Sequence, residues 1–318
     1  MKIGIVGTGF VGSTIAYALL FRNAASEIVL IDINRERALA EAEDLSHAIP
    51  FSYPIVVRQG DYADLSDAVV VVIAAGVNQK PGETRIELLG KNSRIFSQII
   101  PLILQHAPEA ILLIATNPVD IMTYIAARYA TRAGVSQSQV IGTGTTLDTA
   151  RFRLLLGQYL EVDPQHVHGY VIGEHGDSEV LTWSIVDIGG LPLAEFFDLR
   201  SVTFDKATKN KIDEQVRNAA YKIIRGKGAT YYGIGASAAH IINAITHNQK
   251  AILTISTPLK EICGVQNVCL SMPHLIKGTK LVDTLPLHLN EEETNALRAS
   301  AQKIKSLQEK YEQAIKDA

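Results

Sequence analysis

Four short polar patches carry side chains whose types and spacing suit proton transfer and anion binding. "LDTARFR" places Asp148 and Arg151 three residues apart, on one face of a predicted helix. "IGEHGDSE" places His175 between glycines in an apolar surround. "ATNPVD" holds Asn117 at the end of a predicted strand, and "GKGATYYGIG" holds Thr230 near a predicted helix start. Together the four patches predict one polar pocket.

This set matches what is needed to move a hydride to or from the oxygen-bearing carbon of a 2-hydroxy acid. As the hydride leaves, a base must take the hydroxyl proton, and imidazole has the side-chain pKa nearest neutrality. A carboxylate must fix the tautomer of that imidazole. An arginine fork can clamp the substrate carboxylate, and a second arginine can polarise the ketone oxygen. The candidates for these roles, in that order, are His175, Asp148, Arg151 and Arg85.

A glycine-rich turn near the N-terminus predicts a dinucleotide site. Residues 7–12, "GTGFVG", have the spacing G-x-G-x-x-G between a predicted strand and a predicted helix, and Asp32 follows Gly12 by twenty residues. Gly7 permits the tight turn, Gly9 lets backbone N–H groups approach a pyrophosphate, and Gly12 lets the helix pack on the strand. The competing interpretation is a structural turn that binds no nucleotide.

The residues around this turn predict NAD as the cofactor. The helix N-terminus at Phe10 and Val11 stabilises phosphates through its dipole and its free N–H groups. The carboxylate of Asp32 can bind the adenosine ribose hydroxyls and repel a 2′-phosphate, which favours NAD over NADP. Gly76 ends one later strand and Asn117 follows another at the same ligand-binding edge, so we expect them to line the cofactor site too.

Composition excludes several classes of partner. Hydrophobic residues make up 47% of the 318 residues and the net charge is −3, so no electrostatic footprint for nucleic acid or an anionic membrane is visible. The two cysteines suit a reducing cytosol. The uncharged run 3–21 superficially resembles a signal peptide, but glycine and hydroxyl residues interrupt it, and a dinucleotide turn explains them better. We therefore expect a cytoplasmic protein. Neither cysteine nor histidine spacing suggests a metal site.

The alternation of apolar runs and helical periodicity predicts an α/β fold, with a doubly wound parallel Rossmann sheet over residues 1–146. Residues 147–318 predict a C-terminal α+β substrate domain. The expected strands of the first half are 2–6, 27–32, 56–59, 68–76, 110–116 and 140–142, and the expected helices are 10–22, 35–47, 84–106 and 119–130. In the second half we expect helices at 148–160, 205–226, 229–247 and 290–316, strands near 166–172 and 180–186, and a β-rich stretch at 251–273.

From Lys2 to the terminal helix, the chain resembles the NAD-dependent lactate/malate dehydrogenase family. The resemblance is carried by "GTGFVGS", "NQKPGETR", "TNPVD", "LDTARFR" and "GEHGDSE", which are specific in combination. It implies His175 as the acid/base, Asp148 as its partner and Arg151 as the carboxylate clamp. It also implies that Asn117 and Thr230 line the substrate pocket.

The resemblance further implies that the polar segment "GVNQKPGETR", residues 76–85, is a lid over the substrate. Pro81 and Gly82 let the lid swing, and Arg85 arrives as it closes. Gln79 faces the variable end of the substrate, where members that act on malate typically have an arginine. A neutral amide would leave a second substrate carboxylate desolvated and unpaired, at a cost of several kcal/mol.

Gln79 therefore favours pyruvate and L-lactate as substrates, in fermentative glycolysis. Two alternatives stay open. One is a malate or broader 2-hydroxy-acid dehydrogenase, and the other is a non-catalytic Rossmann protein that senses a nucleotide. The second alternative predicts a damaged His175, Asp148 or Arg151, and all three residues are intact.

Arg153 and His168 predict an anion site next to the catalytic helix. Arg153 lies two residues past Arg151, so it points away from the substrate face, and His168 lies on the strand that follows. In bacterial members of the family, the matching arginine and histidine bind fructose 1,6-bisphosphate across a two-fold subunit interface. The resemblance thus implies an allosteric homo-oligomer, with a tetramer expected and a dimer as the alternative. A simple polar interface is the competing interpretation.

Overall fold

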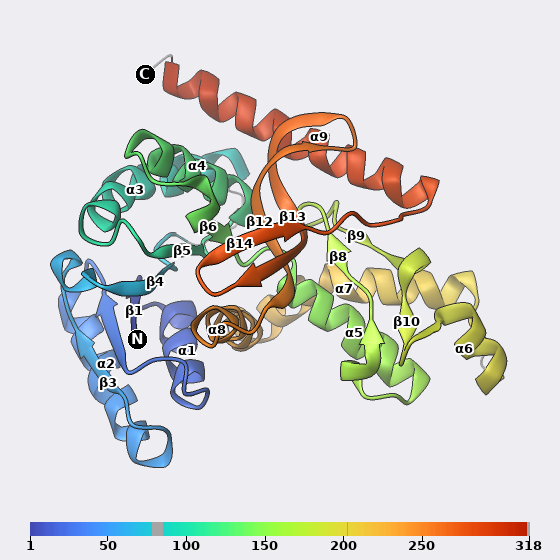
Figure 1. Cartoon of the computed structure of the whole chain (residues 1–318), viewed down its shortest axis with the longest axis horizontal. Coiled ribbons are helices and arrows are strands. Elements are labelled where there is room, and N and C mark those ends of the chain that lie inside the picture. Colours follow the sequence, from blue (N-terminus) through green and yellow to red (C-terminus); the bar gives the residue numbers. More distant parts are fainter. Residues whose placement is uncertain (78–84, 202, 317–318) are drawn as a thin grey trace.

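The computed structural model describes residues 1–77, 85–201 and 203–316 (Figure 1). Within these residues, nine strands form one sheet in the order β14-β13-β12-β6-β5-β4-β1-β2-β3. The strands of this sheet are β1 (Lys2–Val6), β2 (Glu27–Ile31), β3 (Val56–Gln59), β4 (Ala68–Ile73), β5 (Ile111–Ile114), β6 (Val140–Gly142), β12 (Ala251–Ile262), β13 (Val265–Lys277) and β14 (Lys280–Thr284). The helices around it are α1 (Phe10–Leu20), α2 (Arg35–Ala48), α3 (Arg85–His106), α4 (Val119–Arg132), α8 (Tyr232–Thr246) and α9 (Glu291–Lys316).

Strands β1 to β6 are parallel to one another, and their order is that of a complete dinucleotide-binding sheet. The predicted doubly wound α/β fold is confirmed. β4 and β5 read as nearly continuous valine, isoleucine and leucine because both of their faces are buried. Parallel pairing brings the carboxyl ends of all six strands to one edge, and the ligand-binding turns follow that edge.

Helices bury both faces of the sheet (Figure 1). One core cluster joins the sheet to α3, α4 and α9, and the other joins it to α1, α2 and α8. α8 and α9 come from the second half of the sequence, so each core is built from both halves of the chain. The same described part of the chain contains no helix with the length and hydrophobicity that a membrane crossing requires.

The C-terminal strands lengthen the first sheet instead of building a sheet of their own. β12, β13 and β14 form an antiparallel meander, which meets β6 at the pair Ser256–Gly142. This covers the edge that β6 would otherwise expose. The sequence predicts strands here but not their partner, because pairing between distant segments leaves no local pattern. We propose the domain boundary at residues 146/147, just inside the start of α5.

A smaller unit packs beside the sheet and carries α5, the helix of Asp148 and Arg151. Its core joins α5 and α7 to short strands, and Phe152 lies at its centre against Trp183. The predicted strands near 166–172 and 180–186 are present only as two-residue pieces, and α6 is an addition that the periodicity did not predict. The elements are α5 (Thr146–Leu160), α6 (Leu193–Arg200), α7 (Lys206–Lys227), β7 (Val167–His168), β8 (Val171–Ile172), β9 (Val180–Leu181), β10 (Asp187–Ile188) and β11 (Leu191–Pro192).

A close helix contact holds α8 against α1. A Cβ atom added at Gly235 would lie 2.5 Å from Cγ2 of Thr14. We expect Gly235→Ala to lower the free energy of unfolding by about 1–3 kcal/mol, because overpacking a well-packed interface forces the backbones apart. Urea unfolding measures the change. Gly90→Ala is the matched control, since open space surrounds Gly90 on α3 and alanine should stabilise a helix there by up to ~1 kcal/mol. Equal effects of the two changes would contradict the tight contact.

Candidate active site

In the glycine turn between β1 and α1, Gly7 and Gly12 are closely packed and Gly9 between them is not. Gly7 has φ +95° and packs against the backbone of Ala75, so a side chain there would be strained and would clash. A Cβ at Gly12 would overlap the carbonyl oxygen of Gly7. By contrast, nothing lies within 4 Å of the Cβ position of Gly9. The turn therefore leaves space for a ligand at Gly9, where the dinucleotide fingerprint requires it.

Asp32 ties the second strand to this turn. Its Oδ2 atom accepts hydrogen bonds from the backbone N of Thr8 (2.7 Å) and from Thr8 Oγ1 (3.2 Å), while Oδ1 accepts one from the backbone N of Asn34 (2.9 Å). Gly9 is the N-cap of α1 and supplies no side-chain cap, so the first N–H groups of the helix are available to an anion. The residues fit the pyrophosphate and ribose of NAD.

The catalytic candidates meet at the start of α5. Asp148, in the first turn of the helix, is buried, and its two oxygens have different partners. Oδ2 lies 2.5 Å from Nδ1 of His175, and Oδ1 accepts a hydrogen bond of 2.7 Å from Nη1 of Arg151. The side chain of His175 is 26% exposed, so one part of the ring is held by the carboxylate and another part faces the pocket.

Electrostatics make His175 a strong base and Asp148 a weak one. Burial lowers the pKa of His175, but the charge and hydrogen bond of Asp148 raise it by more, to about 9. Burial raises the pKa of Asp148, and the opposite effects of His175 and Arg151 outweigh burial, so the pKa lies below its usual value. The pair is therefore imidazolium and carboxylate at neutral pH, ready to donate a proton.

Two buried residues that the sequence did not single out hold the site in place. Asp120 accepts hydrogen bonds from the backbone N of His175 (2.8 Å) and from Ser256 Oγ (2.6 Å), and burial raises its pKa to about 6. The side-chain oxygen of Asn92 accepts a hydrogen bond from the backbone N of Val77, and its amide group donates one to the carbonyl oxygen of Asn117, each 2.8 Å long. An acid inside the apolar run "NPVDIMTYI" was the available signal for Asp120.

One cavity of about 350 Å³ joins the nucleotide turn to the catalytic cluster. It brings together residues from both halves of the chain. The predicted site residues that line it are Val11, Gly76, Asn117, Arg151, His175 and Thr230. Phe10 does not line the cavity. Its ring is exposed and stacks on Tyr231 at 5.3 Å.

The predicted lid is described only in part. Gln79 lies outside the described residues. Arg85 is the first residue of α3, and the structure describes its backbone position but not its side chain.

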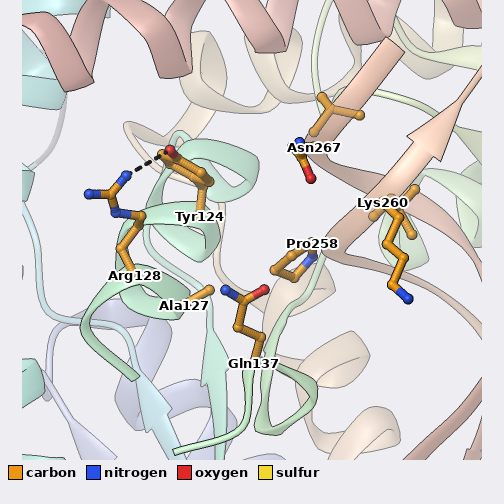
Figure 2. Close-up of a pocket in the computed structure, with 9 residues that line it drawn as sticks. Tyr124, Ala127, Arg128, Gln137, Pro258, Lys260 and Asn267 are labelled. Carbon is orange, nitrogen blue, oxygen red and sulfur yellow. Dashed lines mark hydrogen bonds between the residues drawn. The ribbon is translucent and has the colours of Figure 1, made fainter. Parts of the chain in front are cut away.

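A separate cavity of about 160 Å³ lies between α4 and the β12–β13 hairpin (Figure 2). Arg128 donates a hydrogen bond to the Tyr124 hydroxyl (3.4 Å) and forms an ion pair with Glu312 (2.6 Å). Figure 2 shows the Arg128 guanidinium turned toward Tyr124. None of the predicted site residues lines this cavity. The predicted catalytic residues Arg151 and His175 line the 350 Å³ cavity instead.

Two family models match nearly the whole chain. The model described as lactate/malate dehydrogenase, NAD binding domain, matches residues 1–142. The model described as lactate/malate dehydrogenase, alpha/beta C-terminal domain, matches residues 145–315. The chain belongs to the lactate/malate dehydrogenase family. The family, the NAD cofactor and the oxidoreductase class predicted from the sequence are confirmed.

Individual members of the lactate/malate dehydrogenase family are similar over almost their full length. The chain is 52% identical to an L-lactate dehydrogenase of Geotalea daltonii, with 96% of this chain and 98% of the relative covered. It is 52% identical to an L-lactate dehydrogenase of Thermus aquaticus, with coverages of 96% and 97%. A crystal structure of the minor L-lactate dehydrogenase from Enterococcus mundtii, in a ligands-bound form, superposes with a TM-score of 0.92 at 39% identity, covering 97% of this chain and 98% of that one.

Arg153, on α5, contacts the segment that follows His168. Arg153 Nε donates a hydrogen bond of 3.0 Å to the carbonyl oxygen of Gly169, the residue after His168, and the guanidinium lies 5.5 Å from the ring centre of Tyr170. The His168 side chain is exposed on β7.

The shifted pKa values predict how stability depends on pH. The raised pKa of His175 means that its pairing contributes fully below pH 6.5 and is lost as the pH rises through about 9. The lowered pKa of Asp148 means that its contribution is present above pH 3.8 and is lost in acid. Between pH 6.5 and 9, wild type should therefore lose about 1–3 kcal/mol more stability than Asp148→Asn.

Urea unfolding at the two pH values measures this difference. Asp163→Asn is the control, because Asp163 caps a short exposed helix and should change stability equally at both. Parallel pH dependence of wild type and Asp148→Asn would show that the carboxylate does not hold His175 protonated.

Proposed function

We propose that this chain catalyses the L-lactate dehydrogenase reaction, the reversible transfer of a hydride between NADH and pyruvate. The observation that carries the proposal is the single cavity lined both by Val11, within the G-x-G-x-x-G segment, and by His175 and Arg151. The names of the relatives, which are L-lactate dehydrogenases at about half identity, support the same activity.

Each member of the cluster has one task in pyruvate reduction. NADH supplies the hydride that reduces the carbonyl carbon of pyruvate. His175, as imidazolium, gives one proton to the carbonyl oxygen and is left neutral, so the product is L-lactate. Asp148 fixes the tautomer of the ring and stabilises its charge before the transfer. Arg151 clamps the substrate carboxylate, and its own ion pair with Asp148 holds the guanidinium in place.

The remaining site residues polarise the substrate carbonyl group or line the substrate and cofactor pockets. Arg85 polarises the carbonyl oxygen, and Asn117 and Thr230 line the substrate pocket. Gly76 and Asn117 both line the cofactor site, since both lie beyond the carboxyl ends of strands. Asn92 fixes the relative position of these two loops through its hydrogen bonds.

The neutral amide of Gln79 supports pyruvate over a dicarboxylate such as oxaloacetate. A malate or broader 2-hydroxy-acid dehydrogenase is the second candidate function, because the family includes both activities. We place the enzyme in the cytoplasm, in fermentative glycolysis, as a homo-oligomer for which a tetramer is favoured over a dimer.

The deciding experiment compares kcat/KM for pyruvate and for oxaloacetate by NADH oxidation, in wild type and in Gln79→Arg. Wild type should prefer pyruvate. Gln79→Arg should move the preference toward oxaloacetate, because an arginine pairs the second carboxylate. His175→Ala, which binds NADH but lacks the acid, is the inactive control. Equal or better wild-type efficiency on oxaloacetate would overturn the assignment to pyruvate.

We also propose that Arg153 and His168 bind fructose 1,6-bisphosphate across a subunit interface. Arg153 would clamp a phosphate, and His168 would assist, more strongly when protonated. Two subunits bring like charges together at such a site, and a multiply charged anion relieves the repulsion. The ligand then favours the active quaternary state by its higher affinity for that state.

The effector site is tested by titrating fructose 1,6-bisphosphate at subsaturating pyruvate. Wild type should be activated, and the double variant Arg153→Gln, His168→Gln should not respond. Activation of both proteins, or of neither, would mean that these two residues are not an effector site.

A further inference from the structure

Glu179 is a buried acid beside the catalytic pair for which the reaction described above has no task. It lies just before β9, and its backbone is held on both sides. The backbone N donates a hydrogen bond of 3.1 Å to the carbonyl oxygen of Gly176, and the carbonyl oxygen accepts one of 2.8 Å from Arg217 Nη2. The residue is 4% exposed. Its position is therefore fixed by α7 and by the turn that carries His175.

The carboxyl group of Glu179 belongs to the catalytic cluster by distance. One of its oxygens, one oxygen of Asp148 and one ring nitrogen of His175 all lie within 4.8 Å of one another. Its Oε1 atom is buried, and no hydrogen-bond partner for it exists among the described residues. An ionised carboxylate in such a place is costly, whereas a neutral carboxylic acid is tolerated.

The charges that face Glu179 come from several elements and favour the neutral form. Burial raises its pKa, and the negative charge of Asp148 raises it further, to about 8. His175, Arg217 and Arg151 act in the opposite direction and only partly offset this. The pKa of Glu179 therefore lies well above that of an ordinary glutamate, in the alkaline range in which His175 also titrates.

A cavity connects this cluster to the surface. It has a volume of about 200 Å³ and shares His175, Asn117 and Arg151 with the larger cavity. The acidic groups Asp120, Glu174 and Asp177 also line it, as do apolar side chains of α3 and α9. At its exposed end the hydroxyl of Tyr221 donates a hydrogen bond of 3.0 Å to Asp177.

We propose that Glu179 is the third proton-binding member of the catalytic cluster, a positioning residue that acts through His175 and exchanges protons with solvent along this cavity. In neutral solution Glu179 carries its proton and adds no charge to the site. In alkaline solution it releases one proton to solvent, and the carboxylate then stabilises the imidazolium of His175. The consequence is that proton donation to the substrate persists to higher pH than Asp148 alone would allow. The inference rests on the proposed reduction of pyruvate.

The fall of kcat/KM for pyruvate at high pH, the alkaline limb of the pH profile, tests this role. Glu179→Gln keeps the shape but cannot ionise, so the limb should move to lower pH by about half a unit or more. Glu179→Asp restores an acid and should move the limb back toward that of wild type. Glu293→Gln is the matched control, since Glu293 is an equally buried acid that binds the backbone and hydroxyl of Ser184 away from the cluster. The alkaline limb of Glu293→Gln should coincide with that of wild type. A limb that stays in place in Glu179→Gln would overturn the proposal.

A second measurement does not depend on activity. In wild-type protein labelled with ¹³C at the glutamate carboxyl carbons, one resonance should titrate above pH 7, and its loss in Glu179→Gln assigns it to Glu179. Absence of any glutamate that titrates above pH 7 would overturn the inference. If wild type does not oxidise NADH with pyruvate but this resonance is present, then the proposed function fails while the proton-binding role of Glu179 stands.

Discussion

The site depends on the two contacts that the buried carboxylate of Asp148 makes with cationic side chains. The carboxylate binds His175 through one oxygen and Arg151 through the other, so in the proposed reaction a single group sets the tautomer of the acid and the direction of the clamp. A carboxylate so deeply buried is stable only because two cationic partners satisfy it. Loss of either partner would leave a charge uncompensated in the interior, and this requirement fixes the position of α5 relative to the His175 loop.

The fold supplies that relative position by mixing the two halves of the chain. α8 packs on α1 through the close approach of Gly235 and Thr14, and α9 closes the opposite face of the sheet. Asp120, on α4 of the first half, binds both Ser256 and the backbone of His175 from the second half. The nucleotide turn and the catalytic cluster therefore share a cavity because buried contacts from several elements hold them together.

Local sequence patterns were sufficient to predict much of this arrangement. The apolar runs predicted β1, β3 and β6 with the observed bounds, and the types and spacing of Asp148, Arg151 and His175 predicted their meeting. Asp120, Asn92 and Glu179 were not singled out, because each acts through burial and through partners far away in the sequence. The pairing of β12 with β6 was missed for the same reason. Asp120 and Glu179 lie within "TNPVD" and "GEHGDSE", but these motifs do not show which distant groups each acid meets, because non-local packing decides that.

The protonation state of His175 in the wild-type enzyme tests the central claim most directly. Nuclear magnetic resonance of protein labelled with ¹⁵N at the histidine rings gives the titration of each imidazole, and His175→Gln assigns the signal. If Asp148 controls the site, then His175 titrates near pH 9 and stays imidazolium through neutrality. A midpoint at or below 6.5, the ordinary value for histidine, would contradict the account.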